Sequence, residues 1–278
     1  MDVLTVDYNA TDAPELFCQS LKETGFAVLS YHPIATHFIT RAYAEWEAFF
    51  NSESKMQYLH KELAQAGYFP FGAENAKGNS IRDLKEFYHF YLSANHPPAV
   101  TEVTTALFQQ LNEMAATLLQ WVENYLPKHV AKKLSMPLKS MGTNSPNTLL
   151  RVLHYPPISD GAEEGAERAA AHEDINLLTL LPAATAPGLE VLDAKGRWHA
   201  VTCDPGNIVV NVADTLQMAT DHYYKSTTHR VVNPENDGRK KSRYSMPFFL
   251  HAREEVRLSD QYTVKEYLDE RLREIGIY

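Results

Sequence analysis

The sequence contains little cysteine and no long apolar run. Its 278 residues include only two cysteines, Cys18 and Cys203, which lie far apart in the chain. This argues against a disulfide framework or a thiolate metal site, and we interpret both as reduced thiols. No window is long and apolar enough to span a bilayer, and the first residues lack the basic and apolar regions of a secretory signal. We therefore expect no membrane association and a cytoplasmic location.

Positive charge is also scarce, since 26 Lys and Arg stand against 35 Asp and Glu, a formal net charge of -9. Sequence-independent binding to nucleic acid depends on clustered Lys and Arg, and the one dense basic run, residues 239–241, is typical of a solvated turn. We therefore expect no nucleic-acid partner. With 44% hydrophobic and 22% charged residues the composition is that of an ordinary globular protein. The length suits a single domain over residues 1–278.

Residues 1–147 are expected to be mainly helical. Apolar residues recur at helical spacing over residues 13–24 and 39–50, and residues 26–31 between them have the composition of a strand. Glycines in residues 67–78 indicate a long loop. The clearest helix covers residues 102–133, with an apolar stripe that we expect to lie against a sheet and a proline, Pro127, that kinks the helix or ends it early.

Residues 148–252 consist of short β-rich runs separated by Gly, Pro, Asn and Asp. The predicted strands are residues 149–155, 175–181, 189–192, 198–202, 207–212, 227–232 and 244–250. Seven short strands favour an antiparallel sandwich or jelly roll over alternating βαβ units. Residues 161–171 are small or acidic, as in a mobile insert. A helix within residues 253–278 begins at the capping box Thr263-x-x-Glu266, so the fold class is α+β.

Histidine followed two residues later by a carboxylate is a weak signal, because with 12 histidines about 1.5 such pairs are expected by chance. Two occur. His60 and Glu62 lie in a helical, charged stretch, where positions i and i+2 do not share a face, so we interpret them as solvated surface. His172 and Asp174 lie at the start of a predicted strand, where i and i+2 point the same way and can aim an imidazole and a carboxylate at one point.

A third candidate ligand is His229, in a separate β-rich run that a jelly roll could bring alongside. Two imidazoles and one carboxylate on one face of an octahedron leave positions for substrate and oxygen, which is typical of non-haem iron(II). A zinc hydrolase uses similar ligands, but its His-Glu-x-x-His helix is absent from the sequence. From the residues alone, a metal site and a chance surface pair remain equally open for His172 and Asp174.

Arg243 and Ser245 follow His229 in a predicted strand, where the period of two places guanidinium and hydroxyl on one inner face as a clamp for a carboxylate. The alternative is the polar outer face of an ordinary strand. The intervening Tyr244 favours the clamp, because apolar side chains occupy the other face. Tyr155, at the end of an earlier strand, offers a third donor or is a core tyrosine.

These motifs together resemble those of the iron(II)/2-oxoglutarate-dependent oxygenase superfamily, specifically its isopenicillin N synthase-like branch. The resemblance rests on residues 151–157 (RVLHYPP), 172–174 (HED), 187–191 (PGLEV), 211–214 (NVAD), 224–231 (YKSTTHRV) and 243–249 (RYSMPFF). Residues 25–29 and 83–86 extend it over nearly the whole chain. The chain departs from the branch in residues 31–34 (YHPI), at Ala213, and in a longer gap between His229 and Arg243, so the substrates of relatives are not transferable.

The resemblance implies a double-stranded β-helix core with N-terminal helices, a long supporting helix and a C-terminal helix. It implies a dioxygenase that uses Fe(II), O2 and 2-oxoglutarate, with ascorbate as reductant. Such an enzyme oxidises a C–H bond of a small-molecule substrate and releases succinate and CO2. It assigns the metal to His172, Asp174 and His229, and the far carboxylate of 2-oxoglutarate to Arg243 and Ser245, with Tyr155 beside them.

Two other functions stay open at this point. Some members of the branch oxidise substrates with iron and oxygen but without 2-oxoglutarate, and use the Arg-x-Ser pair for a carboxylate of the substrate. The chain could also be a non-catalytic jelly-roll binding protein with a vestigial site. The primary substrate, the choice between hydroxylation, desaturation and cyclisation, and the oligomeric state do not follow from the sequence.

Overall fold

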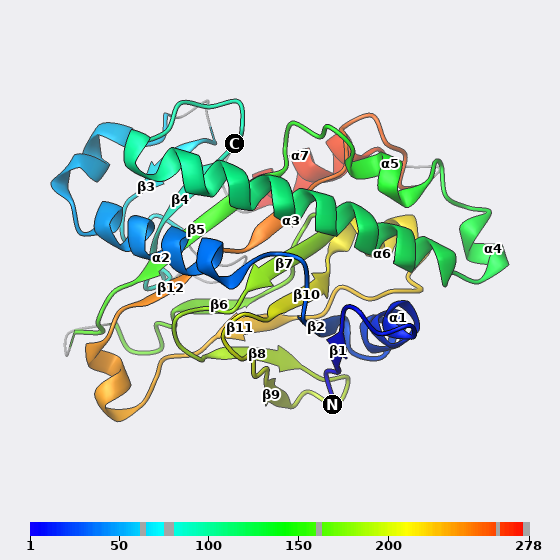
Figure 1. The fold of residues 1–278 in the computed structure, drawn as a ribbon, viewed down its shortest axis with the longest axis horizontal. Helices are drawn as coiled ribbons and strands as arrows, with labels where there is room; N and C mark the ends of the chain where they lie inside the picture. Colours follow the sequence, from blue (N-terminus) through cyan, green and yellow to red (C-terminus); the bar gives the residue numbers. More distant parts are fainter. Residues whose placement is uncertain (62–64, 75–80, 160–162, 260–261, 275–278) are drawn as a thin grey trace.

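The protein is built from two sheets that face each other, with helices over the outer face of the larger one (Figure 1). The computed structural model describes residues 1–61, 65–74, 81–159, 163–259 and 262–274. Among these residues the larger sheet runs in the order β1 (Thr5–Asp7), β2 (Phe26–Ser30), β10 (Ile208–Val212), β7 (Leu178–Pro182), β13 (Phe248–Leu250), β5 (Leu149–Tyr155), β4 (Glu86–Phe90) and β3 (Gly67–Phe69), with β12 (Arg243–Ser245) paired to β5. The smaller sheet runs β6 (Ala169–His172), β11 (His229–Val231), β8 (Leu189–Leu192) and β9 (Trp198–Ala200).

The longest helix, α3, crosses the outer face of the larger sheet (Figure 1). The helices are α1 (Ala13–Thr24), α2 (Thr36–Phe50), α3 (Pro98–Asn124), α4 (Lys128–Ala131), α5 (Leu138–Gly142), α6 (Asp214–Ala219) and α7 (Val264–Glu274), with 3-10 turns at Glu53–Tyr58 and Asn236–Lys240. The buried stripe of α3 includes Leu107, Leu111 and Leu118 and packs into the main apolar core. No helix of the described residues is long and apolar enough to cross a membrane.

Helix α2 is joined to α3 inside that core. The indole of Trp46, fully buried, donates from Nε1 to the Thr104 hydroxyl over 2.9 Å. The long helix predicted over residues 102–133 is divided in the structure. α3 ends at Asn124, and a separate helix, α4, begins after Pro127. The expectation that this proline ends the long helix early is confirmed, since proline lacks the amide that would continue it.

Strands in the N-terminal half complete the larger sheet, where the sequence predicted only one strand. β2 pairs with β10 and β4 pairs with β5, so residues 1–147 are built into the same sheet as the jelly-roll strands. The predicted loop at 67–78 begins with β3, in which Tyr68 and Phe69 lie opposite Tyr88 and Phe87. A strand of three residues is too short to show the alternation of apolar and polar residues that predicts a strand. The part of the loop from residue 75 onward lies outside the described residues.

Three further corrections concern residues 161–250. The predicted strand at 244–250 is two strands, β12 and β13, interrupted at Pro247, which cannot donate to a ladder. The strand predicted at 175–181 begins only at Leu178. The small and acidic segment at 161–171, expected to be a mobile insert, contains the first three residues of β6 and the fully buried Arg168. Its residues 161 and 162 lie outside the described residues.

Two apolar clusters hold the sheets together. One cluster joins β2 and β10 to β8 through Phe26, Val28, Val209, Leu189 and Val191. The other joins β4 and β5 to β6 and β11 through Phe87, Leu153, Tyr155, Ala169 and Val231. The strand order places β7 between the two clusters in the larger sheet. Polar side chains that point inward from β7 and its neighbours are therefore enclosed on both sides.

Gly25 ends α1 in the left-handed conformation, with φ of 77°, and lies against the segment that leads to His229. A Cβ at Gly25 would collide with the Thr227 side chain and lie 2.8 Å from the Lys225 carbonyl oxygen. We expect Gly25→Ala to lower the free energy of unfolding by about 1–2 kcal/mol through backbone strain and by about 1–3 kcal/mol more through the collision. Urea denaturation measures the change. Gly196→Ala is the matched control, because Gly196 has φ of 75° and nothing within 4 Å of the added Cβ, so equal losses in the two variants would contradict the collision.

Candidate metal centre

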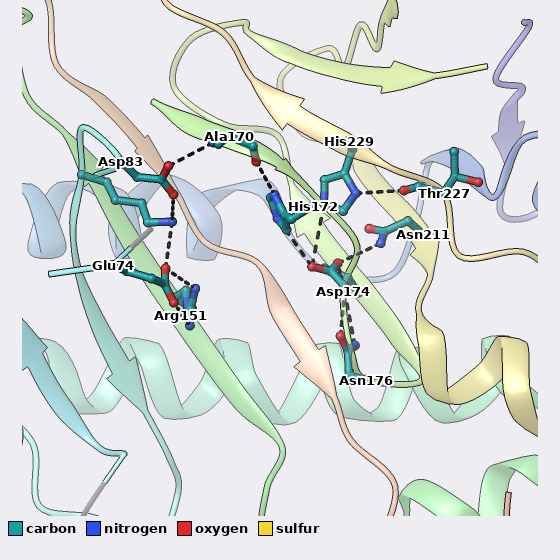
Figure 2. Close-up of polar contacts among 12 residues, drawn as sticks. Glu74, Asp83, Arg151, Ala170, His172, Asp174, Asn176, Asn211, Thr227 and His229 are labelled. Carbon is teal, nitrogen blue, oxygen red and sulfur yellow. Dashed lines mark hydrogen bonds and ion pairs between the residues drawn. The ribbon is translucent and has the colours of Figure 1, made fainter. Parts of the chain in front are cut away.

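His172, Asp174 and His229 converge at one point between the sheets (Figure 2). One ligand atom from each lies within 4.8 Å of the other two. The Nε2 atoms of His172 and His229 are 3.9 and 3.8 Å from Asp174 Oδ1. These are the three residues that the sequence proposed as one site, and the structure brings them together.

The position of each side chain follows from the smaller sheet. His172 ends β6 and lies directly opposite His229, the first residue of β11, so both side chains point to the same face. Asp174 lies outside β6, in the connection to β7. The expectation that His172 and Asp174 share one strand is wrong, because the strand ends at the histidine and the turn directs the carboxylate.

Both imidazoles are fixed with Nε2 toward the common point. The Nδ1 atoms of His172 and His229 lie 2.7 Å from the Ala170 carbonyl oxygen and 3.1 Å from that of Thr227. A carbonyl oxygen only accepts, so in the neutral imidazole Nδ1 carries the hydrogen and Nε2 keeps the free lone pair. Burial, and then the neighbouring His229, lower the pKa of His172 to about 4, which keeps it neutral and able to bind a metal.

The carboxylate of Asp174 is held from the larger sheet. Its Oδ2 accepts hydrogen bonds from Thr179 Oγ1 on β7 at 2.6 Å and from Asn211 Nδ2 on β10 at 2.8 Å. Burial raises the pKa of Asp174, but the nearby imidazoles and these two hydrogen bonds outweigh it and leave the pKa below its ordinary value. Asp174 is therefore ionised, with Oδ1 directed at the imidazoles.

This donor set fits a non-haem iron(II) centre. Two imidazole nitrogens and one carboxylate oxygen approach from one side, and the second atom of each ligand already has a partner in the protein. The roles of Thr179 and Asn211 were not predicted. The available signal was one polar residue within each apolar strand, on the same face as the site.

The predicted carboxylate clamp lies on β12. Arg243 and Ser245 are both buried, while Tyr244 points the other way and stacks on His154 with ring centroids 4.6 Å apart. Arg243 lies opposite Tyr155 in the β12–β5 pair, and its guanidinium is 5.1 Å from the centre of that ring. The Arg243 Nε donates to the Ala186 carbonyl oxygen, but its Nη1 has no partner among the described residues.

A charged network supports the strand that carries His172 (Figure 2). Lys85 donates to Asp83 and contacts Glu74, each at 2.8 Å. Asp83 accepts the backbone amide of Ala170 at 3.1 Å, and the carbonyl of the same residue accepts from His172. The network therefore fixes the Ala170 backbone, on which the orientation of the imidazole depends.

Comparisons with known proteins agree with this site. The sequence matches the model of the 2OG-Fe(II) oxygenase superfamily over residues 146–252, and that of the non-haem dioxygenase N-terminal region over residues 9–112. A 2-oxoglutarate-Fe(II) type oxidoreductase of Aspergillus fumigatus is 30% identical over 81% of this chain and 72% of its own. A solved structure from Shewanella oneidensis, described as an oxygenase, is 47% identical with a TM-score of 0.91 over the full length of both chains. A full-length Neurospora crassa protein solved in complex with α-KG shares the fold at 20% identity, with a TM-score of 0.78 over 97% of this chain and 95% of its own.

The chain therefore belongs to the 2OG-Fe(II) oxygenase superfamily, and the resemblance seen in the sequence is confirmed. Its fold is the double-stranded β-helix of that superfamily. Within the superfamily it is an Fe(II)- and 2-oxoglutarate-dependent dioxygenase.

The charged network predicts a specific loss of stability in acid. Burial raises the pKa of Glu74, but the cations Arg151 and Lys85 lower it well below its usual range. Its contribution is thus complete above about pH 4.5 and is lost as the pH falls toward the lower folded-state pKa. We expect Glu74→Gln to lower the free energy of unfolding at pH 7 by about 1–3 kcal/mol, which is below the range for a fully buried pair because Glu74 is partly exposed. Below pH 4.5 the free energy of unfolding should fall less steeply in this variant than in wild type.

Urea denaturation at pH 7, 5, 4 and 3.5 measures both effects. Glu45→Gln is the control, because Glu45 has the same 23% side-chain exposure as Glu74 but, among the described residues, pairs only with the exposed Arg41 of its own helix. That variant should change stability by no more than about 0.5 kcal/mol. Parallel pH curves for wild type and Glu74→Gln would contradict the role of the network.

Proposed function

We propose that this dioxygenase holds its iron through His172, Asp174 and His229 and oxidises a C–H bond of a small organic substrate. The observation that carries the proposal is that one ligand atom of each residue lies within 4.8 Å of the other two, with the Nε2 atoms of His172 and His229 3.9 and 3.8 Å from Asp174 Oδ1. Iron(II) bound there would supply the activation of oxygen, coupled to the conversion of 2-oxoglutarate to succinate and CO2. The protein supplies the geometry, since each of the three side chains is fixed by a hydrogen bond to its other nitrogen or oxygen atom.

The second part of the proposal assigns the far carboxylate of 2-oxoglutarate to Arg243 and Ser245, with Tyr155 beside them. Arg243 is 2% exposed and has an Nη1 without a partner among the described residues, so a carboxylate would complete its hydrogen bonding. Tyr155 would lie beside this carboxylate, because its ring faces the guanidinium of Arg243. Ascorbate as reductant, a cytoplasmic location, and no nucleic-acid or membrane partner stay predictions from the sequence.

The iron assignment predicts the metal content of three variants. His172→Ala, Asp174→Ala and His229→Ala should each weaken iron(II) binding by more than about 100-fold, because even residues behind the ligands contribute about 10–100-fold. Metal analysis after anaerobic loading and dialysis measures this. His60→Ala is the control, since His60 stacks on Phe69 and is not one of the three convergent residues, so it should leave the iron content unchanged. Unchanged iron in any two of the alanine variants would refute the assignment.

The cosubstrate assignment predicts a loss of affinity in Arg243→Lys. Lys cannot copy the paired hydrogen bonds of a guanidinium, so 2-oxoglutarate binding should weaken by about 1–3 kcal/mol while iron stays bound. Ser245→Ala should cost less, because it removes one neutral donor. The measurement is an anaerobic titration of 2-oxoglutarate into iron-loaded protein, following the visible charge-transfer band of a bidentate 2-oxo acid. If wild type shows no band and no saturable binding yet consumes oxygen with a substrate, the oxidase alternative replaces this one, and Arg243 then holds the substrate's own carboxylate.

A further inference from the structure

A second guanidinium, that of Arg168, is buried beside the proposed cosubstrate pocket. Arg168 precedes β6 directly and is 1% exposed. Its Nη2 donates to the Lys241 carbonyl oxygen at 3.0 Å, while its Nε has no partner among the described residues. Lys241 lies two residues before Arg243, so this hydrogen bond fixes Arg168 at the start of the strand that carries the clamp.

Arg168 and Arg243 share one aromatic ring. Their guanidinium carbons lie 5.9 and 5.1 Å from the centre of the Tyr155 ring. Burial, and then the charge of Arg243, lower the pKa of Arg168 to about 10. Both guanidinium groups are cations, because arginine stays protonated in proteins. They are held out of water against the same ring, which attracts each of them weakly.

Within the described residues, neither cation has a carboxylate partner. The adjacent Glu167 directs its carboxylate to Arg230 at 3.2 Å instead. Other inward cations of this protein are paired, since Lys85 meets Asp83 and Glu74. A buried charge without a counter-ion is strongly destabilising, so two of them at one place indicate that an anion arrives with a ligand.

We propose that Arg168 is a second cation of the cosubstrate pocket, donating from Nε to the far carboxylate of 2-oxoglutarate that Arg243 and Ser245 also hold. The inference rests on the proposed function and adds a specificity-determining residue to it. A carboxylate can accept up to four hydrogen bonds, so it can satisfy both guanidinium groups and the serine hydroxyl together. Arg168 then selects 2-oxo acids that carry a second carboxylate.

The test is an anaerobic titration of iron-loaded wild type and Arg168→Met with two ligands, followed by the charge-transfer band. The first ligand is 2-oxoglutarate, and the second is 2-oxobutanoate, which lacks the far carboxylate. We expect Arg168→Met to weaken 2-oxoglutarate binding by at least about tenfold, the effect of one lost charge-assisted hydrogen bond, and to leave the affinity for 2-oxobutanoate unchanged. Arg168→Lys keeps the charge and should fall between the two proteins.

Arg253→Met is the matched control, because the Arg253 guanidinium binds carbonyl oxygens near α5, at Ser140 and Thr143, and should not affect either ligand. Wild-type affinity of Arg168→Met for 2-oxoglutarate, alongside a loss in Arg243→Lys, overturns the inference and leaves the proposed function standing. An equal loss for both 2-oxo acids also overturns it, because the effect would not come from the far carboxylate. A wild type that does not bind 2-oxoglutarate at all overturns the proposed function itself.

A second measurement decides the case if Arg168→Met does not fold. Wild-type crystals grown with manganese(II) and 2-oxoglutarate under exclusion of oxygen show the pocket directly. Arg168 Nε within hydrogen-bond distance of the far carboxylate supports the inference. An Arg168 that contacts only atoms of the chain, with the carboxylate on Arg243 and Ser245 alone, overturns it.

Discussion

The antiparallel pairing of β6 with β11 is the contact on which the site depends. It places His229 directly opposite His172, and a shift of one residue would turn one imidazole to the other face of the sheet. The register is secured from both sides. β8 pairs with the far edge of β11, and Asp83 holds the backbone of β6 at Ala170. The register shifts between His229 and Val231, where the ladder is irregular, and pairing continues with Val231 opposite Ala169.

Asp174 joins this pair to the rest of the molecule. It lies where the chain leaves the smaller sheet at β6 and enters the larger one at β7. Its Oδ1 faces the two imidazoles of the smaller sheet, and its Oδ2 is held by Thr179 and Asn211 of the larger sheet. The distance between the sheets, set by apolar packing on either side, therefore also fixes the geometry of the three candidate ligands.

The sequence predicted the candidate ligands of the site better than the strands that position them. The motif spacing and the family resemblance indicated all three candidate ligands, and strands β5 and β8 match their predicted ranges. Of the N-terminal strands only β2 was predicted. The others were missed, because β1 and β3 are three residues long and β4 lies between regions interpreted as loop and helix. Local patterns carry no information on which distant strand completes a sheet, and that pairing is what closes this one.

Arg168 was missed for a related reason. It stands alone among small and acidic residues, a composition typical of exposed loops, and only the pairing of β6 and the contact with Lys241 place it inside. Single residues whose role depends on long-range packing leave no local signal. The hydroxyl of Thr179 and the amide of Asn211 belong to the same group, since each acts through a carboxylate from another segment.

Some interior cations of this protein have a carboxylate partner in the chain and others have none. Lys85 and Arg151 are neutralised by carboxylates of the chain itself, so they stabilise the fold whether or not a ligand is present. Arg168 and Arg243 have no such partner among the described residues. Their repulsion opposes folding of the empty protein, and an anion that binds between them removes this cost in the folded state alone. In the proposed pocket, affinity for a dicarboxylate and the stability of this end of the barrel would therefore be linked through the same two guanidinium groups.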